Sequence, residues 1–135
     1  MALKTLFFGV MGAPYESDLC TSLLRMVSEA LDCGHTITVW TCGGATTLTR
    51  TALGDTKPKN LLDLLAGSDR SYPSTAALIG ALVRDSAGRL QWLVCRHCAE
   101  ERGAMDQIPE ARIQPPLRFA EHLERCDVPV IMGVK

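Results

Sequence analysis

The chemistry of this sequence concentrates on Cys95 and Cys98, which enclose two basic side chains in the run Cys95-Arg96-His97-Cys98. Residues three apart share one side of a helix, so the two thiols are expected to lie close together. Neighbouring cations and the unpaired N–H groups of a helix start both favour a thiolate. The spacing therefore predicts Cys95 as a reactive nucleophile, with Cys98 as a second thiol beside it and Arg96 and His97 lining the site.

The other cysteines fall into two groups. Cys42 follows a β-branched run and precedes Gly43-Gly44, where the backbone could approach closely, so it either lines the site with Cys95 or closes a strand as a small buried residue. The remaining three stand on or near expected helices, where burial as small apolar residues is the favoured interpretation: Cys20, Cys33 and Cys126.

A β-α-β pattern positions these residues. Lys4–Val10 is an apolar run typical of a buried strand, apolar residues recur at helical spacing from Ser17 to Gly34, and Thr36–Thr41 is rich in β-branched side chains. Such a unit requires a parallel sheet, and sites in open parallel sheets form beyond the carboxyl ends of the strands. Both Cys42 and Cys95 follow such strand ends.

The rest of the chain continues the same alternation. Helices are expected at Ser74–Arg84, Cys98–Met105 and Leu117–Arg125, and strands at Gln91–Val94, Val128–Val134 and, more briefly, Ala111–Ile113. Between Cys42 and Tyr72 we expect one or two short helices, including the leucine-rich Asn60–Ala66. The predicted fold class is α/β, a three-layer α/β/α domain with a mostly parallel sheet of four or five strands, each buried on both faces.

Size and composition limit the classes of function. A chain of 135 residues fits a single domain, 1–135, and 47% apolar with 21% charged residues excludes intrinsic disorder. The net charge of -1, without a basic run, argues against nucleic acid, and the longest apolar stretches are too short to span a membrane. One lysine and two glycines make the first residues a poor export signal, so we expect a cytoplasmic protein whose cysteines stay reduced.

Cys95-Arg-His-Cys98-Ala-Glu-Glu-Arg102-Gly103, placed after a strand and opening a helix, resembles the DsrE/DsrF-like sulfur-relay family, which includes TusD-type carriers. In that family a strand ends in a cysteine and an Arg-Gly pair follows, with the glycine eight positions on. Cys95 and Gly103 keep this interval, and some members also carry a second cysteine where Cys98 stands. The resemblance covers most of the chain and is weakest between Cys42 and Tyr72.

The resemblance implies a DsrE-like fold and a sulfurtransferase-type carrier that holds sulfane sulfur as a persulfide on Cys95. Cys98 would resolve that persulfide, and Arg102 and Gly103 would act structurally, by pairing near the helix and allowing close packing. The implied partners are sulfur-donor and sulfur-acceptor proteins or small thiols. The family also implies a homotrimer or homohexamer, whose contacts we place at Tyr15, Phe119 and the segment Ile108–Leu117.

Three other functions remain open on the residues alone. A C-x-x-C pair is also typical of thiol-disulfide oxidoreductases, although the motif lies too late in the chain for a thioredoxin-like domain. A closed zinc site needs four ligands and no second cysteine pair exists, so no metal is expected unless the fold brings Cys42 with His35 or His97 to the pair. The glycines form no nucleotide-binding motif, so no cofactor is expected. A noncatalytic assembly subunit is the third alternative.

Overall fold

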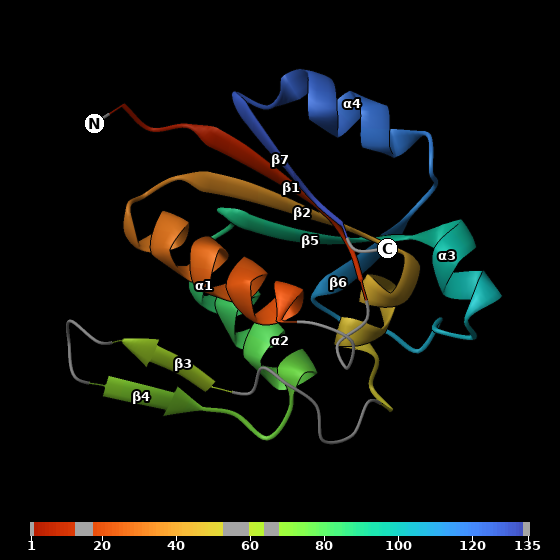
Figure 1. The fold of residues 1–135 in the computed structure, drawn as a ribbon, viewed down its shortest axis with the longest axis horizontal. Coiled ribbons are helices and arrows are strands. Elements are labelled where there is room, and N and C mark those ends of the chain that lie inside the picture. The colour runs from red at the N-terminus through yellow and green to blue at the C-terminus, as the bar shows by residue number, and fades with distance from the viewer. Residues whose placement is uncertain (1, 13–17, 53–59, 64–67, 134–135) are drawn as a thin grey trace.

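The computed structural model describes residues 2–12, 18–52, 60–63 and 68–133. Within these ranges a parallel sheet has the order β6-β5-β2-β1-β7, formed by β1 Thr5–Met11, β2 Thr36–Cys42, β5 Leu90–Cys95, β6 Ala111–Gln114 and β7 Val128–Met132. Helices α1 Leu19–Asp32 and α2 Thr75–Asp85 lie on one face and α4 Arg118–Arg125 covers the other (Figure 1). The predicted three-layer α/β class, with a parallel sheet and a short strand after residue 110, is confirmed.

The two faces of the sheet carry different cores. The larger core packs β1, β2 and β5 against α1 and α2 through side chains such as Phe8, Val39 and Leu24, all buried. The smaller core, on the α4 side, holds Phe7, Trp40, Leu93 and Cys95, with residues of α4 packed against it. Successive side chains of a strand alternate between the two faces of the sheet. Trp40 and Leu93, each two residues before a cysteine, therefore share the smaller core with Cys42 and Cys95.

The expected start and end of α2 are also confirmed. The Ser74 hydroxyl accepts a hydrogen bond from the Ala77 N–H at 3.1 Å, which satisfies one of the unpaired donors of the first turn. After α2 the chain turns through Ala87 and Gly88, both with positive φ, and enters β5. These two features bring the strand that ends in Cys95 into the middle of the sheet.

The helix expected at Asn60–Ala66 is wrong. Residues 60–63 of the expected helix Asn60–Ala66 form strand β3 Asn60–Asp63, which pairs antiparallel with β4 Ser68–Ser71; the remaining residues of that segment lie outside the described ranges. Apolar runs this short do not distinguish a helix from a strand, and the pairing partner decides. The 3-10 helix η1 Gly43–Thr49 is the short helix found in this region.

The last strand was expected to be buried, and it is not. β7 lies at the edge of the sheet, pairing only with β1, and its Val128 and Ile131 side chains are 39% and 56% exposed. A buried parallel strand needs a neighbour or a covering helix on every side, which the described part of this single chain does not supply.

The helix expected at Cys98–Met105 begins earlier and is shorter, α3 Arg96–Glu101. Among the described residues, no helix has the length and apolar character needed to cross a bilayer.

A polar bridge joins η1 to the segment that follows α3. Gln107 donates from its amide to the carbonyl oxygens of Thr46 at 2.9 Å and Ala104 at 2.6 Å, and accepts from the Thr49 hydroxyl. Beside it, Arg50 pairs with Asp106 at 2.8 Å, and this hydrogen bond is the main reason that the pKa of Asp106 is lowered. Because η1 follows β2 and the other segment follows α3, the bridge fixes the end of β2 relative to α3.

Replacing Gln107 by Leu should therefore destabilise the fold by about 2 kcal/mol, since two carbonyls and a hydroxyl lose a half-buried partner. Urea unfolding followed by circular dichroism measures the loss. The matched control is Gln91→Leu, the same chemical change at an exposed position of β5, which should stay within about 0.5 kcal/mol of the wild type. Equal stability of the two variants would show that the bridge contributes nothing.

Candidate functional site: a cysteine cluster beside an apolar pocket

The cysteines of β2 and β5 meet because the two strands are neighbours in register. Thr41 pairs with Val94, so the next residues, Cys42 and Cys95, leave adjacent strand ends side by side. The Thr41 hydroxyl donates to the Leu93 carbonyl at 2.9 Å and so links these ends further. The sequence could only place both thiols on the same edge; the strand order makes them neighbours.

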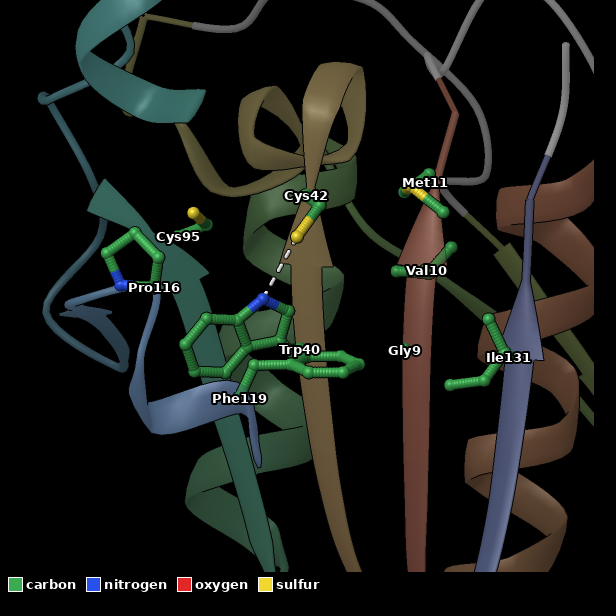
Figure 2. Close-up of a pocket in the computed structure, with 9 residues that line it drawn as sticks. All are labelled: Gly9, Val10, Met11, Trp40, Cys42, Cys95, Pro116, Phe119 and Ile131. Atoms are coloured by element: carbon green, nitrogen blue, oxygen red, sulfur yellow. Dashed lines mark hydrogen bonds between the residues drawn. The ribbon is translucent and has the colours of Figure 1, made fainter. Parts of the chain in front are cut away.

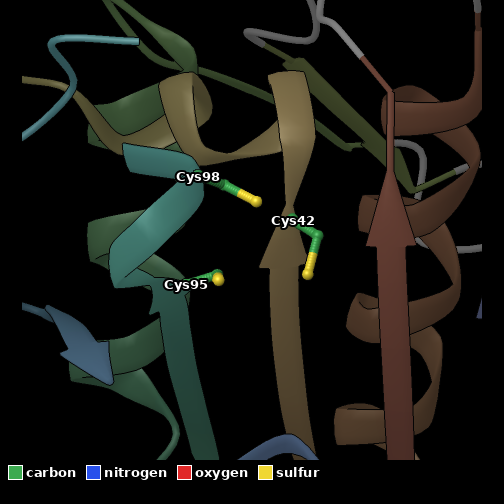
Figure 3. Close-up of side chains that lie close together, drawn as sticks. All are labelled: Cys42, Cys95 and Cys98. Carbon is green, nitrogen blue, oxygen red and sulfur yellow. The ribbon is translucent and has the colours of Figure 1, made fainter. Parts of the chain in front are cut away.

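Cys98 completes a cluster of three thiols. It lies in the first turn of α3, directly after β5, and the side chains of Cys95 and Cys98 extend from this junction toward β2 (Figure 3). The three Sγ atoms, those of Cys42, Cys95 and Cys98, all lie within 4.8 Å of one another. The expected proximity of Cys95 and Cys98 is observed, and Cys42 joins them rather than facing the core alone.

The three thiols differ in exposure. Cys95 is only 4% exposed, whereas Cys42 and Cys98 are half-buried. The predicted nucleophile is therefore the most buried of the three thiols. Access to its sulfur requires a hollow in the surface.

Such a hollow is present. A cavity of about 260 Å³ opens on the α4 side of the sheet and has an almost entirely apolar wall. Its lining residues come from four strands, α4 and the segment before α4 (Figure 2): Gly9, Val10, Met11, Trp40, Cys42, Cys95, Pro116, Phe119 and Ile131. Two of the three clustered thiols, those of Cys42 and Cys95, therefore line one apolar pocket.

Gly9 makes room for this pocket. A Cβ atom at Gly9 would lie 3.0 Å from Ile131 Cδ1 and 3.3 and 3.4 Å from the rings of Phe7 and Phe119. Contacts this short would displace the neighbouring side chains, which close-packed surroundings resist. A glycine at position 9 of β1 is therefore explained by the lack of room for a Cβ atom on the pocket side of the strand.

Aromatic rings build one side of the pocket. Phe119 of α4 packs edge-to-face on Phe7 and on Trp40, with ring centroids 5.3 and 5.7 Å apart. The His122 ring lies 6.2 Å from that of Trp40, and burial is the main cause that lowers the pKa of His122, so it is neutral at pH 7. Trp40 and Phe119 thus give the pocket that holds Cys42 and Cys95 an aromatic wall.

Trp40 also contacts the cluster directly. Its indole N–H donates to the Cys42 sulfur at 3.0 Å (Figure 2). Burial raises the pKa of the Cys42 thiol from its ordinary value near 9 to about 11, and the indole hydrogen bond opposes only part of that rise. Cys95 and Cys98 add smaller contributions that also raise it. At neutral pH Cys42 is therefore a protonated thiol.

The remaining predicted site residues do not reach the sulfurs. Arg96 and His97 are exposed on α3. Arg102 donates to the Cys98 carbonyl at 3.3 Å and pairs with Glu101 at 3.5 Å, which is the expected structural role near the helix. Gly103 does not serve close packing, because a Cβ there would meet nothing within 4 Å; its φ of +60° gives it a conformational role at the end of α3 instead.

Several other sequence predictions can be compared with the structure. Cys20 is buried in α1, as expected, and burial raises the pKa of its thiol to about 11. Cys33 is exposed, so its predicted burial is wrong, and Cys126 is half-buried with its thiol donating to the Leu123 carbonyl at 3.1 Å. Phe119, expected at a subunit contact, packs within its own chain, and Tyr15 lies outside the described residues.

Sequence reasoning missed most of the pocket wall. Trp40 precedes Cys42 by two residues in a strand, so the alternation of side chains could have placed both on one face. Gly9 interrupts an otherwise apolar strand, which is a weaker signal of close approach. Nothing local in the sequence indicates that Phe119 and Ile131, far along the chain, face the same cavity.

Comparison with known proteins supports the fold. No family model matches the sequence, and no curated protein matches it either. Among solved structures, the crystal structure of the ychN protein from E. coli superposes with a TM-score of 0.70 at 15% sequence identity, covering 96% of this chain and 99% of that chain. The chain therefore has a DsrE-like α/β fold.

The thiol chemistry of Cys42 gives a direct test of the site. With a pKa of about 11, its thiolate fraction at pH 7 should be about a hundredfold below that of an ordinary thiol. Iodoacetamide labelling of the reduced protein, followed by peptide mapping, should show a Cys42 rate that keeps rising up to about pH 11. Trp40→Phe removes the one hydrogen bond that lowers this pKa and should slow labelling at pH 9 further. A Cys42 labelling rate that levels off below pH 9 would show that the pKa of this thiol is not raised by burial.

Proposed function

We propose that this protein carries sulfane sulfur as a persulfide on Cys95. The observation that carries the proposal is the place of the Cys95 thiol, in the wall of an apolar pocket and within 4.8 Å of two further thiols. The resemblance of the Cys95–Gly103 segment to sulfur-relay proteins and the DsrE-like fold agree with it. The partners proposed are donor and acceptor proteins, or small thiols, in a reducing compartment such as the cytoplasm.

Loading is a transfer between sulfurs without net oxidation. The Cys95 thiolate attacks the outer sulfur of a donor persulfide, R–S–SH, so that a new S–S bond forms at Cys95 while the donor S–S bond breaks. The products are Cys95–S–SH and the donor thiolate R–S⁻. Delivery is the same exchange in reverse, with an acceptor thiolate attacking the outer sulfur and Cys95 leaving as a thiolate.

Cys98 gives the persulfide a second fate. Its thiolate can attack the inner sulfur of Cys95–S–SH, forming a Cys95–Cys98 disulfide and releasing HS⁻, after which an external dithiol must reduce the disulfide. The closeness of the two sulfurs supports this step. Cys42 is a poor competitor for the same attack, because burial keeps its thiol protonated at neutral pH.

The pocket suits such a cargo. A persulfide sulfur is soft and weakly hydrated, and an apolar wall of Trp40, Phe119 and Ile131 disfavours water beside it. The volume of about 260 Å³ admits a small thiol or the end of a cysteine side chain from a partner. Phe119 and Pro116, at the pocket on the α4 side, would contact that partner first.

Loading can be measured on the intact protein. Incubation of the reduced protein with a small-molecule persulfide donor should add one sulfur atom by mass, and peptide mapping should locate it on Cys95. Cys95→Ser should abolish loading, because Cys42, the other thiol in the pocket wall, is protonated at neutral pH and Cys98 does not line the pocket. Cys98→Ser should leave loading intact and prolong the persulfide, because the resolving thiol is gone.

Cys126→Ser is the matched control, since Cys126 packs against the same small core but lies outside the thiol cluster. It should load and discharge as the wild type does. Normal loading of the Cys95 variant would refute the carrier proposal. A wild type that never loads but cycles a Cys95–Cys98 disulfide would establish the oxidoreductase instead. If the wild type shows neither sulfur loading nor disulfide cycling, the protein is a noncatalytic assembly subunit.

Assembly into a homotrimer or homohexamer is part of the proposal. Leu117 and Met105 are 86% and 45% exposed, and the edge strand β7 exposes Ile131 of the pocket wall, so large apolar side chains are left at the surface of the single chain. Burial of such side chains between copies would be favourable. Sedimentation velocity at micromolar concentration should give a trimer or hexamer, and Leu117→Glu should shift the distribution toward smaller species. A monomeric wild type would contradict assembly.

A further inference from the structure

The three thiols meet the geometric needs of a metal site that neither the fold nor the proposed function assigns. Three sulfurs bound to one ion at about 2.3 Å lie about 3.8 to 4 Å from one another. The Sγ atoms of Cys42, Cys95 and Cys98 all lie within 4.8 Å of one another. Side-chain rotations that move each sulfur by less than about 1 Å would bring them to the spacing of a bound ion. Their backbones need not move.

The donor set selects the kind of ion. The cluster contains sulfur alone, and in the described part of the chain no histidine or carboxylate joins it. Thiolate and thioether sulfurs are soft ligands, which select monovalent copper, zinc and iron–sulfur clusters over magnesium, calcium or manganese. A hard cation is therefore excluded as an occupant.

The surroundings favour copper over zinc. Zinc takes four ligands in a closed site, and the pocket wall beside Cys42 and Cys95 offers apolar side chains in place of a fourth nitrogen or oxygen donor. Monovalent copper, which soft thiolate ligands select, needs no such nitrogen or oxygen donor. An ion that is satisfied by sulfur alone fits this site best.

We propose that Cys42, Cys95 and Cys98, each releasing its thiol proton on binding, hold one monovalent copper ion as a three-sulfur site beside the apolar pocket. The inference does not rest on sulfur carriage, because binding requires the arrangement of the thiols and not a persulfide. Ligation and sulfur loading would exclude each other, since both use the Cys95 sulfur.

Anaerobic titration of the reduced full-length protein with a monovalent copper salt, against a chromogenic copper(I) chelator as competitor, tests the site. We expect one ion per chain. X-ray absorption of the complex should show three sulfur neighbours, because all three thiols contribute. Zinc, titrated against a chromogenic zinc chelator, should bind more weakly than copper.

Cys42 separates this proposal from an ordinary C-x-x-C pair. Cys42→Ser should weaken copper affinity at least roughly tenfold, since loss of even an outer partner of a ligand costs that much, and should lower the sulfur count to two. Cys33→Ser and Cys126→Ser change cysteines outside the cluster and should leave affinity unchanged. Circular dichroism of each variant reports whether it remains folded.

Copper affinity and sulfur count unchanged in a folded Cys42→Ser variant would overturn the three-sulfur site, as would the absence of a one-to-one complex in the wild type. If Cys42→Ser does not fold, the sulfur count of the wild-type complex decides, and a count of two refutes the proposal. Tighter binding of zinc than copper would refute the choice of ion. Sulfur loading is measured without copper, so its failure would leave this result unaffected.

Discussion

The parallel register of β1, β2 and β5 is the constraint on which the site depends. Because Met11 pairs with Cys42 and Thr41 with Val94, the carboxyl ends of three central strands finish at one edge of the sheet. Alternation of side chains then places Phe7, Trp40 and Leu93 on the α4 face beneath them. A slip of one residue in the β2–β5 pairing would turn Cys42 and Cys95 toward opposite faces.

The site also depends on unequal covering of the two faces. Helices α1 and α2 close one face with a large apolar core, whereas the other face is covered by one short helix, α4, through Phe119 and Leu123. Because Gly9 has no side chain, nothing projects from β1 into the space between the sheet and α4 at this point. An apolar pocket remains there instead of a filled interface. The incomplete packing on this face leaves a pocket whose wall includes Cys42 and Cys95, although Cys95 is otherwise buried.

Polar contacts beyond the pocket hold the thiols in place. The Thr41 hydroxyl links β2 to β5, the Gln107 amide links η1 to the end of α3, and Arg102 binds the Cys98 carbonyl. Each contact joins segments that carry, or directly follow, one of the three cysteines. Close sulfurs in an apolar setting can exchange sulfur or share a soft ion, and the same geometry serves both because each requires thiols that approach without backbone movement.

The sequence by itself determined the class of fold and the leading thiol pair, because β-α-β periodicity and the Cys95–Cys98 spacing are local patterns. It also placed Cys42 after a strand end, with two interpretations open. Only the tertiary structure decided between them, since strand order and register are set by contacts between distant segments. The pocket could not be predicted from the sequence either. Its wall includes residues from four elements, Gly9, Trp40, Phe119 and Ile131, and no local sequence pattern indicates that they face one cavity. The same reason explains the errors at β3 and β7, where a pairing partner and a sheet edge, rather than composition, fixed the outcome.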